Sequence, residues 1–181
     1  MTGLERNADV VRMVSYAPLF ANAQAWQWTP DLIWVNSLQC MGTPSYYAQM
    51  LFSRNRGTVV LPVACEDAGA AAGGPSFIVS AARDDAAGEI ILKAVNASRE
   101  PVATAVDLQG VATVSPTGQA IVLASASLSD QNAFEDPAKV SPKTLPLENV
   151  GRQFHYSFGP CSLTVLRIRA SANGLGPRRS D

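Results

Sequence analysis

The pattern of apolar and polar residues changes near Gly57 and divides the chain into two parts. In the first part, residues 32–35 form a short unbroken apolar run, LIWV. Such a run predicts a strand covered on both faces, as in the parallel sheets of α/β folds, because a strand with one face in water alternates. Thr43 and Pro44 then predict the start of a helix, with an N-cap followed by proline at the first helical position.

The helix predicted after Thr43 has an apolar stripe and a defined end. Tyr47, Met50 and Leu51 fall at positions i, i+3 and i+4, so their side chains share a face that can lie on a sheet. Gly57 is the expected stop signal. Strand and helix together form one predicted βα unit.

An earlier helix is predicted from Thr2 to about Tyr16, and Pro18 ends it. Thr2 and Glu5 have the spacing of a capping box, in which each side chain bonds a free backbone N–H of the first turn. Glu5 and Asp9 lie one turn apart, and we interpret them as a solvated and capping face rather than a catalytic pair.

Residues 1–56 therefore give helix, strand, helix, and these elements cannot form a core alone. A parallel strand with no partner leaves its backbone groups unpaired, and two helices cannot cover both of its faces. We therefore expect this segment to be cut from a larger α/β domain or to pair with another chain.

After Gly57 the apolar runs are short and separated by turn residues, which is typical of a β-sandwich or barrel. Phe154, Tyr156 and Phe158 alternate onto one face of a predicted strand, which leaves His155 on the opposite, exposed face. Residues 66–75 are predicted to be a flexible loop, 130–148 a long connection and 171–181 a disordered tail. The predicted strands cover residues 58–63, 76–82, 89–95, 102–108, 119–123, 153–158 and 162–168.

Charge and cysteine content exclude several classes of protein. The formal net charge of −1 suggests neither nucleic acid nor an anionic membrane as partner. Cys40, Cys65 and Cys161 are far apart and lack C-x-x-C spacing, so we predict buried or partly buried free thiols rather than disulfides or a zinc site. His155 is the single histidine, which removes most metal and triad schemes based on histidine. We predict no metal and no cofactor.

Four motifs occur in order along residues 1–57: MTGLERNADVV-x-M-x-SYAPLF, W-x-P-D-L-I-W, GTPSYY and LFS-x-N-x-G. In this order and spacing they resemble the distal part of family 51 glycoside hydrolases, the α-L-arabinofuranosidases, and the resemblance spans roughly residues 1–170. In that family a (β/α)8 barrel carries catalysis and a jelly-roll β-sandwich accompanies it. The resemblance implies a mostly β fold, with residues 1–56 as the last helix–strand–helix of the barrel, 57–170 as a jelly-roll-type β-sandwich and 171–181 as the tail.

The resemblance also implies an activity, namely retaining hydrolysis of terminal non-reducing α-L-arabinofuranosyl residues in arabinan and arabinoxylan. This places the protein in hemicellulose degradation and L-arabinose metabolism, with an arabinofuranosyl-containing polysaccharide or oligosaccharide as its partner. Such hydrolysis needs two carboxyl groups about 5–5.5 Å apart across the sugar. The family's two catalytic glutamates lie N-terminal to the helix that begins this chain, so we expect no catalytic residue in residues 1–181 and an inactive fragment.

The acidic pairs of this chain do not replace those glutamates. They are Glu66–Asp67, Asp84–Asp85 and Glu135–Asp136, and adjacent acids in loops are usually solvated turn formers. Catalytic groups of barrel enzymes project from the carboxyl ends of strands, and the predicted barrel strand ends at Val35 and Asn36, without a carboxylate.

The resemblance leaves this chain a wall of the active site, and we predict Trp26, Trp28 and Asn36 as substrate-binding residues. A Trp ring can stack on a furanose while an amide bonds its hydroxyl groups. Alternatively, Trp34 and one of the other two tryptophans pack the barrel, and Asn36 caps a turn. The sequence does not distinguish Trp26 from Trp28. Thr29 and Met41 depart from residues frequent in the family, so contacts of this loop need not transfer unchanged.

An alternative function is a non-catalytic sandwich that binds carbohydrate or mediates assembly, with residues 1–56 docked on a separate chain. The absence of Trp from residues 57–170 counts against carbohydrate binding there. The expected partners are the missing barrel portion or other copies of the chain, without nucleic acid or membrane. Secreted and cytoplasmic locations both stay open.

Overall fold

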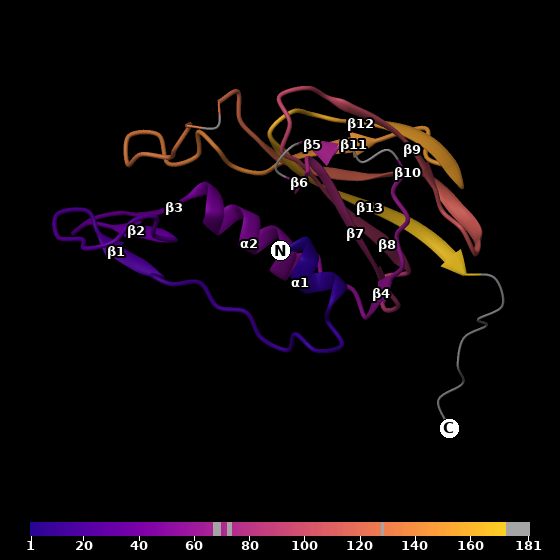
Figure 1. Ribbon diagram of the computed structural model, residues 1–181, viewed down its shortest axis with the longest axis horizontal. Helices are drawn as coiled ribbons and strands as arrows, with labels where there is room; N and C mark the ends of the chain where they lie inside the picture. The colour runs from indigo at the N-terminus through magenta and orange to yellow at the C-terminus, as the bar shows by residue number, and fades with distance from the viewer. Residues whose placement is uncertain (67–69, 72–73, 128, 173–181) are drawn as a thin grey trace.

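The computed structural model describes residues 1–66, 70–71, 74–127 and 129–172. Figure 1 shows two helices and a small sheet on one side and long β-strands on the other. The N-terminal elements are α1 (Thr2–Arg6), β1 (Phe20–Asn22), β2 (Ile33–Val35), β3 (Cys40–Gly42) and α2 (Pro44–Arg54). The strands that follow are β4 (Val59–Leu61), β5 (Ala70–Ala71), β6 (Gly74–Pro75), β7 (Phe77–Asp84), β8 (Glu89–Asn96), β9 (Val102–Asp107), β10 (Val111–Ala124), β11 (Lys143–Leu147), β12 (Gln153–Phe158) and β13 (Ser162–Ala172).

The main β-structure is a six-stranded antiparallel sheet in the order β11-β10-β13-β8-β7-β4. β9 and β12 form a second, two-stranded layer on one of its faces. The predicted mostly β character is thereby confirmed. The assignment of residues 1–56 to a barrel and of 57–170 to a jelly roll stays a prediction.

The larger core lies between the six-stranded sheet and the β9–β12 layer. Alternation places Leu166 and Ile168 of β13 in this core and Arg167 and Arg169 on the other face, as their spacing predicts. Phe154 and Phe158 of β12 are buried in this core, and Tyr156 is partly buried beside them. His155 is exposed, again as predicted. The fully or nearly buried members are Phe77, Val79, Ala81, Ile90, Leu92, Ala94, Leu108, Val111, Ala120, Leu147, Val150, Phe154, Phe158, Leu166 and Ile168.

The opposite face of the sheet is covered by α2. The Thr43 hydroxyl accepts the Tyr46 amide N–H at 3.3 Å, so the predicted N-cap is confirmed. Of the predicted stripe, Tyr47 and Leu51 pack toward the sheet as expected, whereas Met50 is outside the core on this face and Phe52 is buried in it instead. Leu51 and Phe52 pack in a second core with Ile91, Leu123, Val140, Leu163 and Val165.

The predicted stop at Gly57 is wrong. The helix ends at Arg54, and Asn55 is its C-cap, with a side-chain amide that donates to the Leu51 carbonyl at 2.9 Å. Gly57 serves a close approach instead, since a Cβ there would lie 2.6 Å from the Arg83 carbonyl oxygen of β7. The glycine therefore lets the chain leave α2 directly against the sheet.

β2, which the sequence predicts as an unpaired parallel strand, has partners on both sides. It pairs in parallel with β1 and antiparallel with β3. The sequence missed both partners because each spans only three residues and carries no strand signal of its own. The three residues of β2 are only half-buried. The elements expected to cover both faces of this strand are therefore absent from the described part of the chain.

α1 is much shorter than predicted, since it ends at Arg6 and turns follow to residue 10. The capping box is also wrong, because Met1 is the N-cap, no side chain caps the helix and Thr2 is buried inside it. Glu5 is not solvated as expected: it forms an ion pair with Lys93 of β8 and accepts from the Ser80 hydroxyl of β7 at 2.5 Å. Tertiary contacts of Glu5 therefore fix α1.

The predicted strands are present with modest shifts, and β10 is longer than expected at 14 residues. The connection predicted over 130–148 contains β11. Its Asn132 side-chain amide donates to the Gly42 carbonyl of β3 at 2.9 Å, which joins the connection to the small sheet. β13 runs to Ala172, two residues into the predicted tail. Residues 173–181 and part of the loop predicted over 66–75 lie outside the described residues.

The three cysteines are free, as predicted. Their predicted burial is wrong for Cys40 and Cys65, which are exposed, and Cys161 is partly buried. Cys40 is exposed because alternation along β3 places it on the face opposite the buried Met41. Cys65 lies in the irregular segment after β4.

Candidate functional site

The candidate site lies where the parallel strands β1 and β2 end side by side. Asn22 ends β1 opposite Val35, and Asn36 directly follows β2. The Asn36 side-chain oxygen accepts the Leu38 and Gln39 amide N–H groups at 2.9 and 2.8 Å, which is the turn-capping role anticipated as the alternative. The Asn22 oxygen likewise accepts the Gln24 amide N–H at 2.9 Å. Two asparagines thus shape adjoining loops at one edge.

The predicted tryptophans lie in the loop that joins these strands. Trp26 meets Trp34 of β2 edge to face, with ring centroids 5.8 Å apart and planes at 84°. Trp28 is 70% exposed and Trp26 is 52% exposed. The contact with Trp34 ties Trp26 to the strand that Asn36 follows, while Trp28 leaves most of its ring open to solvent.

Two carboxylates of the described residues, Asp31 and Asp84, do not form a catalytic pair. Asp31 is buried at the opposite end of β2 from Asn36, and its Oδ2 atom makes no hydrogen bond within the described structure. Asp84 accepts the Ala86 and Ala87 amide N–H groups in the turn after β7, as expected of a turn former. Neither carboxylate therefore adds to the aromatic and amide side chains that Trp26 and Asn36 provide in this part of the described structure.

Asn22 was not identified from the sequence. The segment around it lacks an apolar alternation, so β1 was not predicted and nothing marked Asn22 as the end of a strand. Only the pairing of Phe20 with Ile33, and of Asn22 with Val35, brings this residue beside Asn36.

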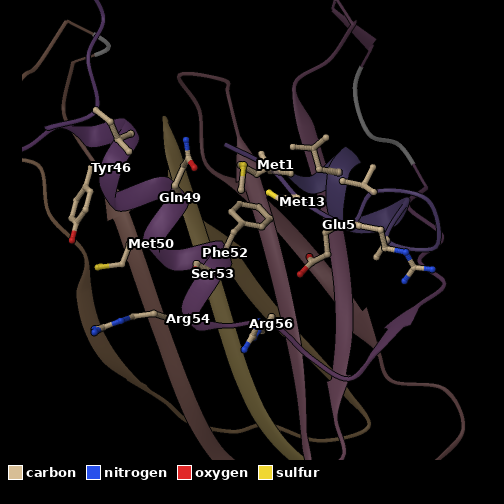
Figure 2. Close-up of a pocket in the computed structure, with 16 residues that line it drawn as sticks. Met1, Glu5, Met13, Tyr46, Gln49, Met50, Phe52, Ser53, Arg54 and Arg56 are labelled. Carbon is tan, nitrogen blue, oxygen red and sulfur yellow. The ribbon is translucent and has the colours of Figure 1, made fainter. Parts of the chain in front are cut away.

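A groove of about 610 Å³ lies between the N-terminal segment and α2. Figure 2 shows Met1 and Met13 on one side and Phe52 on the other, with Arg54 and Arg56 near the end of α2. The groove could not be predicted from the sequence, because the pattern of residues 10–14 favours a helix that the structure does not form. The full lining is Met1, Leu4, Glu5, Ala8, Val11, Arg12, Met13, Val14, Leu32, Tyr46, Gln49, Met50, Phe52, Ser53, Arg54 and Arg56.

A second cavity, of about 520 Å³, lies at the end of the β9–β12 layer. Its lining is polar and consists of Asp107, Gln109, Gly110, Arg152 and Gln153. No cluster of three or more metal-ligating side chains occurs in the part of the chain that the structure describes. Across the same residues, neither helix has the length and apolarity needed to cross a membrane.

Comparison with known proteins places this geometry in a family. A profile of the alpha-L-arabinofuranosidase C-terminal domain matches residues 1–162. Alpha-L-arabinofuranosidase 2 of Arabidopsis thaliana is 35% identical over 151 residues, which are 82% of this chain and 22% of that protein. Alpha-L-arabinofuranosidase A of Aspergillus niger is 33% identical over 172 residues, which are 92% of this chain and 25% of that protein.

Solved structures agree with these matches. An arabinose-bound family 51 α-L-arabinofuranosidase superposes with a TM-score of 0.86 and 32% identity, covering 94% of this chain and 26% of that one. The Thermotoga maritima α-L-arabinofuranosidase shares the fold, with a TM-score of 0.76 at 17% identity, over 92% of this chain and 36% of that one. This chain spans about a quarter of the curated relatives named above. It belongs to the α-L-arabinofuranosidases of glycoside hydrolase family 51, as a C-terminal portion of such an enzyme.

Proposed function

We propose that this chain is the C-terminal part of an enzyme that removes terminal non-reducing α-L-arabinofuranosyl residues from arabinan or arabinoxylan with retention of configuration. The carrying observation is the edge at the carboxyl ends of β1 and β2, which presents Trp26, Trp28 and two asparagines. Carboxyl ends of parallel strands are where barrel enzymes place their sites. In this proposal, both catalytic glutamates belong to the rest of the enzyme.

In the proposed site, an exposed tryptophan ring stacks on the apolar side of a furanose. Trp28 has more open ring surface, whereas Trp26 is better held because Trp34 contacts it. The Asn36 side-chain oxygen accepts two backbone N–H groups, which fixes the side chain. Its amide nitrogen donates to the Gln39 side-chain oxygen at 3.3 Å and has a second N–H. That amide is the group available to a sugar hydroxyl.

The half-covered N-terminal region supports the proposal that residues 1–56 complete a (β/α)8 barrel. The groove between the N-terminal segment and α2 is lined by apolar side chains of both elements. Val10 and Met13 are 73% and 87% exposed, a state that normally marks a surface made to be covered. Residues 57–170 then form a jelly-roll-type sandwich that supports the barrel.

Hydrolysis of an aryl α-L-arabinofuranoside tests the proposal. The 181-residue chain, shown to be folded by circular dichroism, should give no turnover above a mock preparation. A longer polypeptide that joins this chain to a glutamate-bearing barrel should be active and should retain the anomeric configuration of the product. Activity of the 181-residue chain alone would refute the assignment of the glutamates elsewhere, and an inactive folded long form would refute the activity.

Variants of the long form test the contacts with substrate. Trp28→Ala and Trp26→Ala should each raise KM, with the larger rise at the residue that stacks on the sugar, because the stacking surface is lost with the indole. His155→Ala, on the exposed face of β12, is the matched control and should leave KM unchanged. Unchanged KM in both tryptophan variants would remove this loop from the substrate site.

The polar cavity beside β9 and β12 favours a second candidate, a non-catalytic carbohydrate-binding module. Asp107, Arg152 and the two glutamines could bond sugar hydroxyls, although the lining holds no aromatic ring. Calorimetric titration of the 181-residue chain with arabino-oligosaccharides tests this function. Binding that Arg152→Ala abolishes would support it, whereas binding lost only in the tryptophan variants would assign the ligand to the first site.

A further inference from the structure

Lys93 is an unusual residue for the position it occupies. It lies on the face of β8 that packs against the helices, between Ile91 and Val95, and its side chain is completely buried. A buried ammonium is costly unless an opposite charge and hydrogen bonds compensate it. A methionine of similar length would pack at this position without that cost, so the lysine needs a reason beyond filling space.

The compensating charge comes from far away in the sequence. The Lys93 ammonium donates to one carboxylate oxygen of Glu5, on α1. The other oxygen accepts the Ser80 hydroxyl at 2.5 Å. Ser80 and Lys93 are directly opposite each other in the register of β7 and β8, so these two strands present a two-point receptor for one carboxylate.

Two further contacts complete the arrangement. The Phe52 ring of α2 lies 5.4 Å from the Lys93 nitrogen, which is cation–π distance. The Arg6 guanidinium donates to the Val79 carbonyl of β7 at 3.4 Å. Both helices and two strands therefore meet at Lys93, and Figure 2 shows Glu5 beside the groove between the helices.

We propose that Lys93 is a positioning residue: with Ser80 it forms a receptor for the Glu5 carboxylate, and this contact seats the N-terminal segment on the sheet. The inference concerns contacts within the chain and does not depend on the proposed activity. A buried ion pair can add little net stability and still penalise every arrangement that leaves one of its charges unpaired. Lys93 thus makes the docked position of α1 the one in which its charge is compensated.

The two partners should differ in their sensitivity to substitution. Lys93 is fully buried, whereas the Glu5 side chain keeps 13% exposure. Glu5→Gln leaves a charged lysine in a dry site. Lys93→Met leaves a carboxylate that still bonds Ser80 and still reaches water. Breaking a buried pair by removing the partner of the more buried charge is the costlier change.

Thermal unfolding of four forms of the 181-residue chain tests the proposal: the unchanged chain, Glu5→Gln, Lys93→Met and the double variant. We expect Glu5→Gln to lower Tm by about 10 °C, Lys93→Met by about 3 °C, and the double variant to return to within about 3 °C of the unchanged chain. Lys139→Met is the matched control for charge removal, because Lys139 pairs with Asp130 on the surface with 48% of its side chain exposed. It should shift Tm by less than about 2 °C.

A local readout separates seating of α1 from general stability. Trypsin cleavage after Arg6, at the end of α1, should become at least about 10-fold faster in Glu5→Gln at a temperature where the sheet is still folded. Cleavage after Arg12, which lies outside regular structure, serves as the internal reference. If Glu5→Gln does not fold, rescue by the added Lys93→Met still tests the coupling. Equal losses from Glu5→Gln in the unchanged chain and in the Lys93→Met background, or unchanged cleavage after Arg6, would overturn the proposal.

Discussion

The N-terminal region and the β-structure that follows it expose their apolar side chains very differently. Of the thirteen exposed large hydrophobic residues in the described part of the chain, ten precede residue 56 and three follow it. The β-structure instead holds a contiguous core between two layers, with Leu166 and Ile168 fully buried. The β-structure thus buries most of its large hydrophobic residues within itself, whereas the N-terminal region leaves many of its own exposed, which is the basis for the proposal that it completes a barrel.

The contrast also shows how the two regions are joined. α2 contributes Leu51 and Phe52 to the second core, while α1 is held by the contact of Glu5 with Lys93. At the C-terminal end of α2, the Arg167 guanidinium of β13 bonds both Glu89 and the Asn55 side chain. The N-terminal region is therefore held on the β-structure by apolar packing of α2 and by polar contacts at Glu5 and Asn55.

The largest expected difference is between two leucines that undergo the same substitution. Leu166→Ala, in the larger core, should lower the free energy of unfolding by about 3 kcal/mol, because it removes buried contacts and leaves a cavity. Leu38→Ala is the matched control in the N-terminal region, where this side chain is 93% exposed, and should change it by less than about 0.5 kcal/mol. Urea unfolding followed by circular dichroism measures both. Similar losses of unfolding free energy in the two variants would contradict the contrast between a β-structure with its own core and an N-terminal region with exposed apolar side chains.

A smaller loss is expected at the hydrogen bonds that join the long connection to the small sheet. Asn132 is buried, donates to the Gly42 and Val140 carbonyls at 2.9 and 3.1 Å, and accepts the Val140 amide N–H at 2.7 Å. Asn132→Ala leaves these backbone groups unpaired and should cost about 2 kcal/mol.

Tryptophan fluorescence is the suitable measurement for Asn132→Ala, because all three tryptophans lie between residues 26 and 34, near β3. Asn22→Ala, which removes one hydrogen bond of an exposed side chain, is the control and should cost less than about 1 kcal/mol. A normal urea midpoint for Asn132→Ala would show that the connection is not fixed by this residue.

The two regions also differ in how far their sequence predicted their structure. Where each residue's environment is set by strand alternation, prediction succeeded: β12 was placed at residues 153–158, with the faces of Phe154 and His155 correctly assigned. The predicted length of α1 was wrong. The apolar face that the pattern predicts through residue 16 is not covered by a second element in the described part of the chain, and the helix ends at Arg6. Periodicity states which side chains should share a face, but a face stabilises a helix only when something packs on it.

The candidate site shows a related limit. Trp26, Trp28 and Asn36 could be proposed as site residues from residue type and from the end of a predicted strand. Asn22 could not, because its relevance depends on the pairing of β1 with β2. The Glu5–Lys93 contact spans 88 residues and was likewise invisible, since a lysine within an apolar strand shows no local sign of the partner that compensates it.

A smaller effect is expected in the pH dependence of the unfolding free energy, which depends on the contact between Lys93 and Glu5. Burial lowers the pKa of Lys93, although hydrogen bonding and charge attraction from Glu5 oppose the shift and the Arg167 charge adds to it. In the unfolded chain a lysine titrates at about 10.4. Between the lowered native pKa and that value the unfolded chain binds more protons, so this residue makes the free energy of unfolding rise with pH.

Comparing the unchanged chain with Lys93→Met isolates this contribution, because other titrating groups largely cancel in the difference. The unfolding free energy of the unchanged chain, relative to that of Lys93→Met, should increase with pH between the lowered native pKa of Lys93 and about pH 10.4. A difference that stays flat up to about pH 10.4 and falls above that value would mean that the native pKa is raised, and hence that the pair with Glu5 outweighs burial.

The smallest effect on stability is expected at the groove, where the comparison of the two regions predicts a change in association instead. Met13, which lines the groove, and Val10, three residues before it, are largely exposed, and replacing both by serine should alter the free energy of unfolding by less than about 0.5 kcal/mol. Exposed apolar side chains that gather around a groove favour self-association, so the same double variant should associate less at high protein concentration. Sedimentation velocity measures this directly. Replacing Val59 and Leu145, exposed apolar residues of the β-structure's two edge strands, is the control, and an equal reduction there would show that the groove is not special.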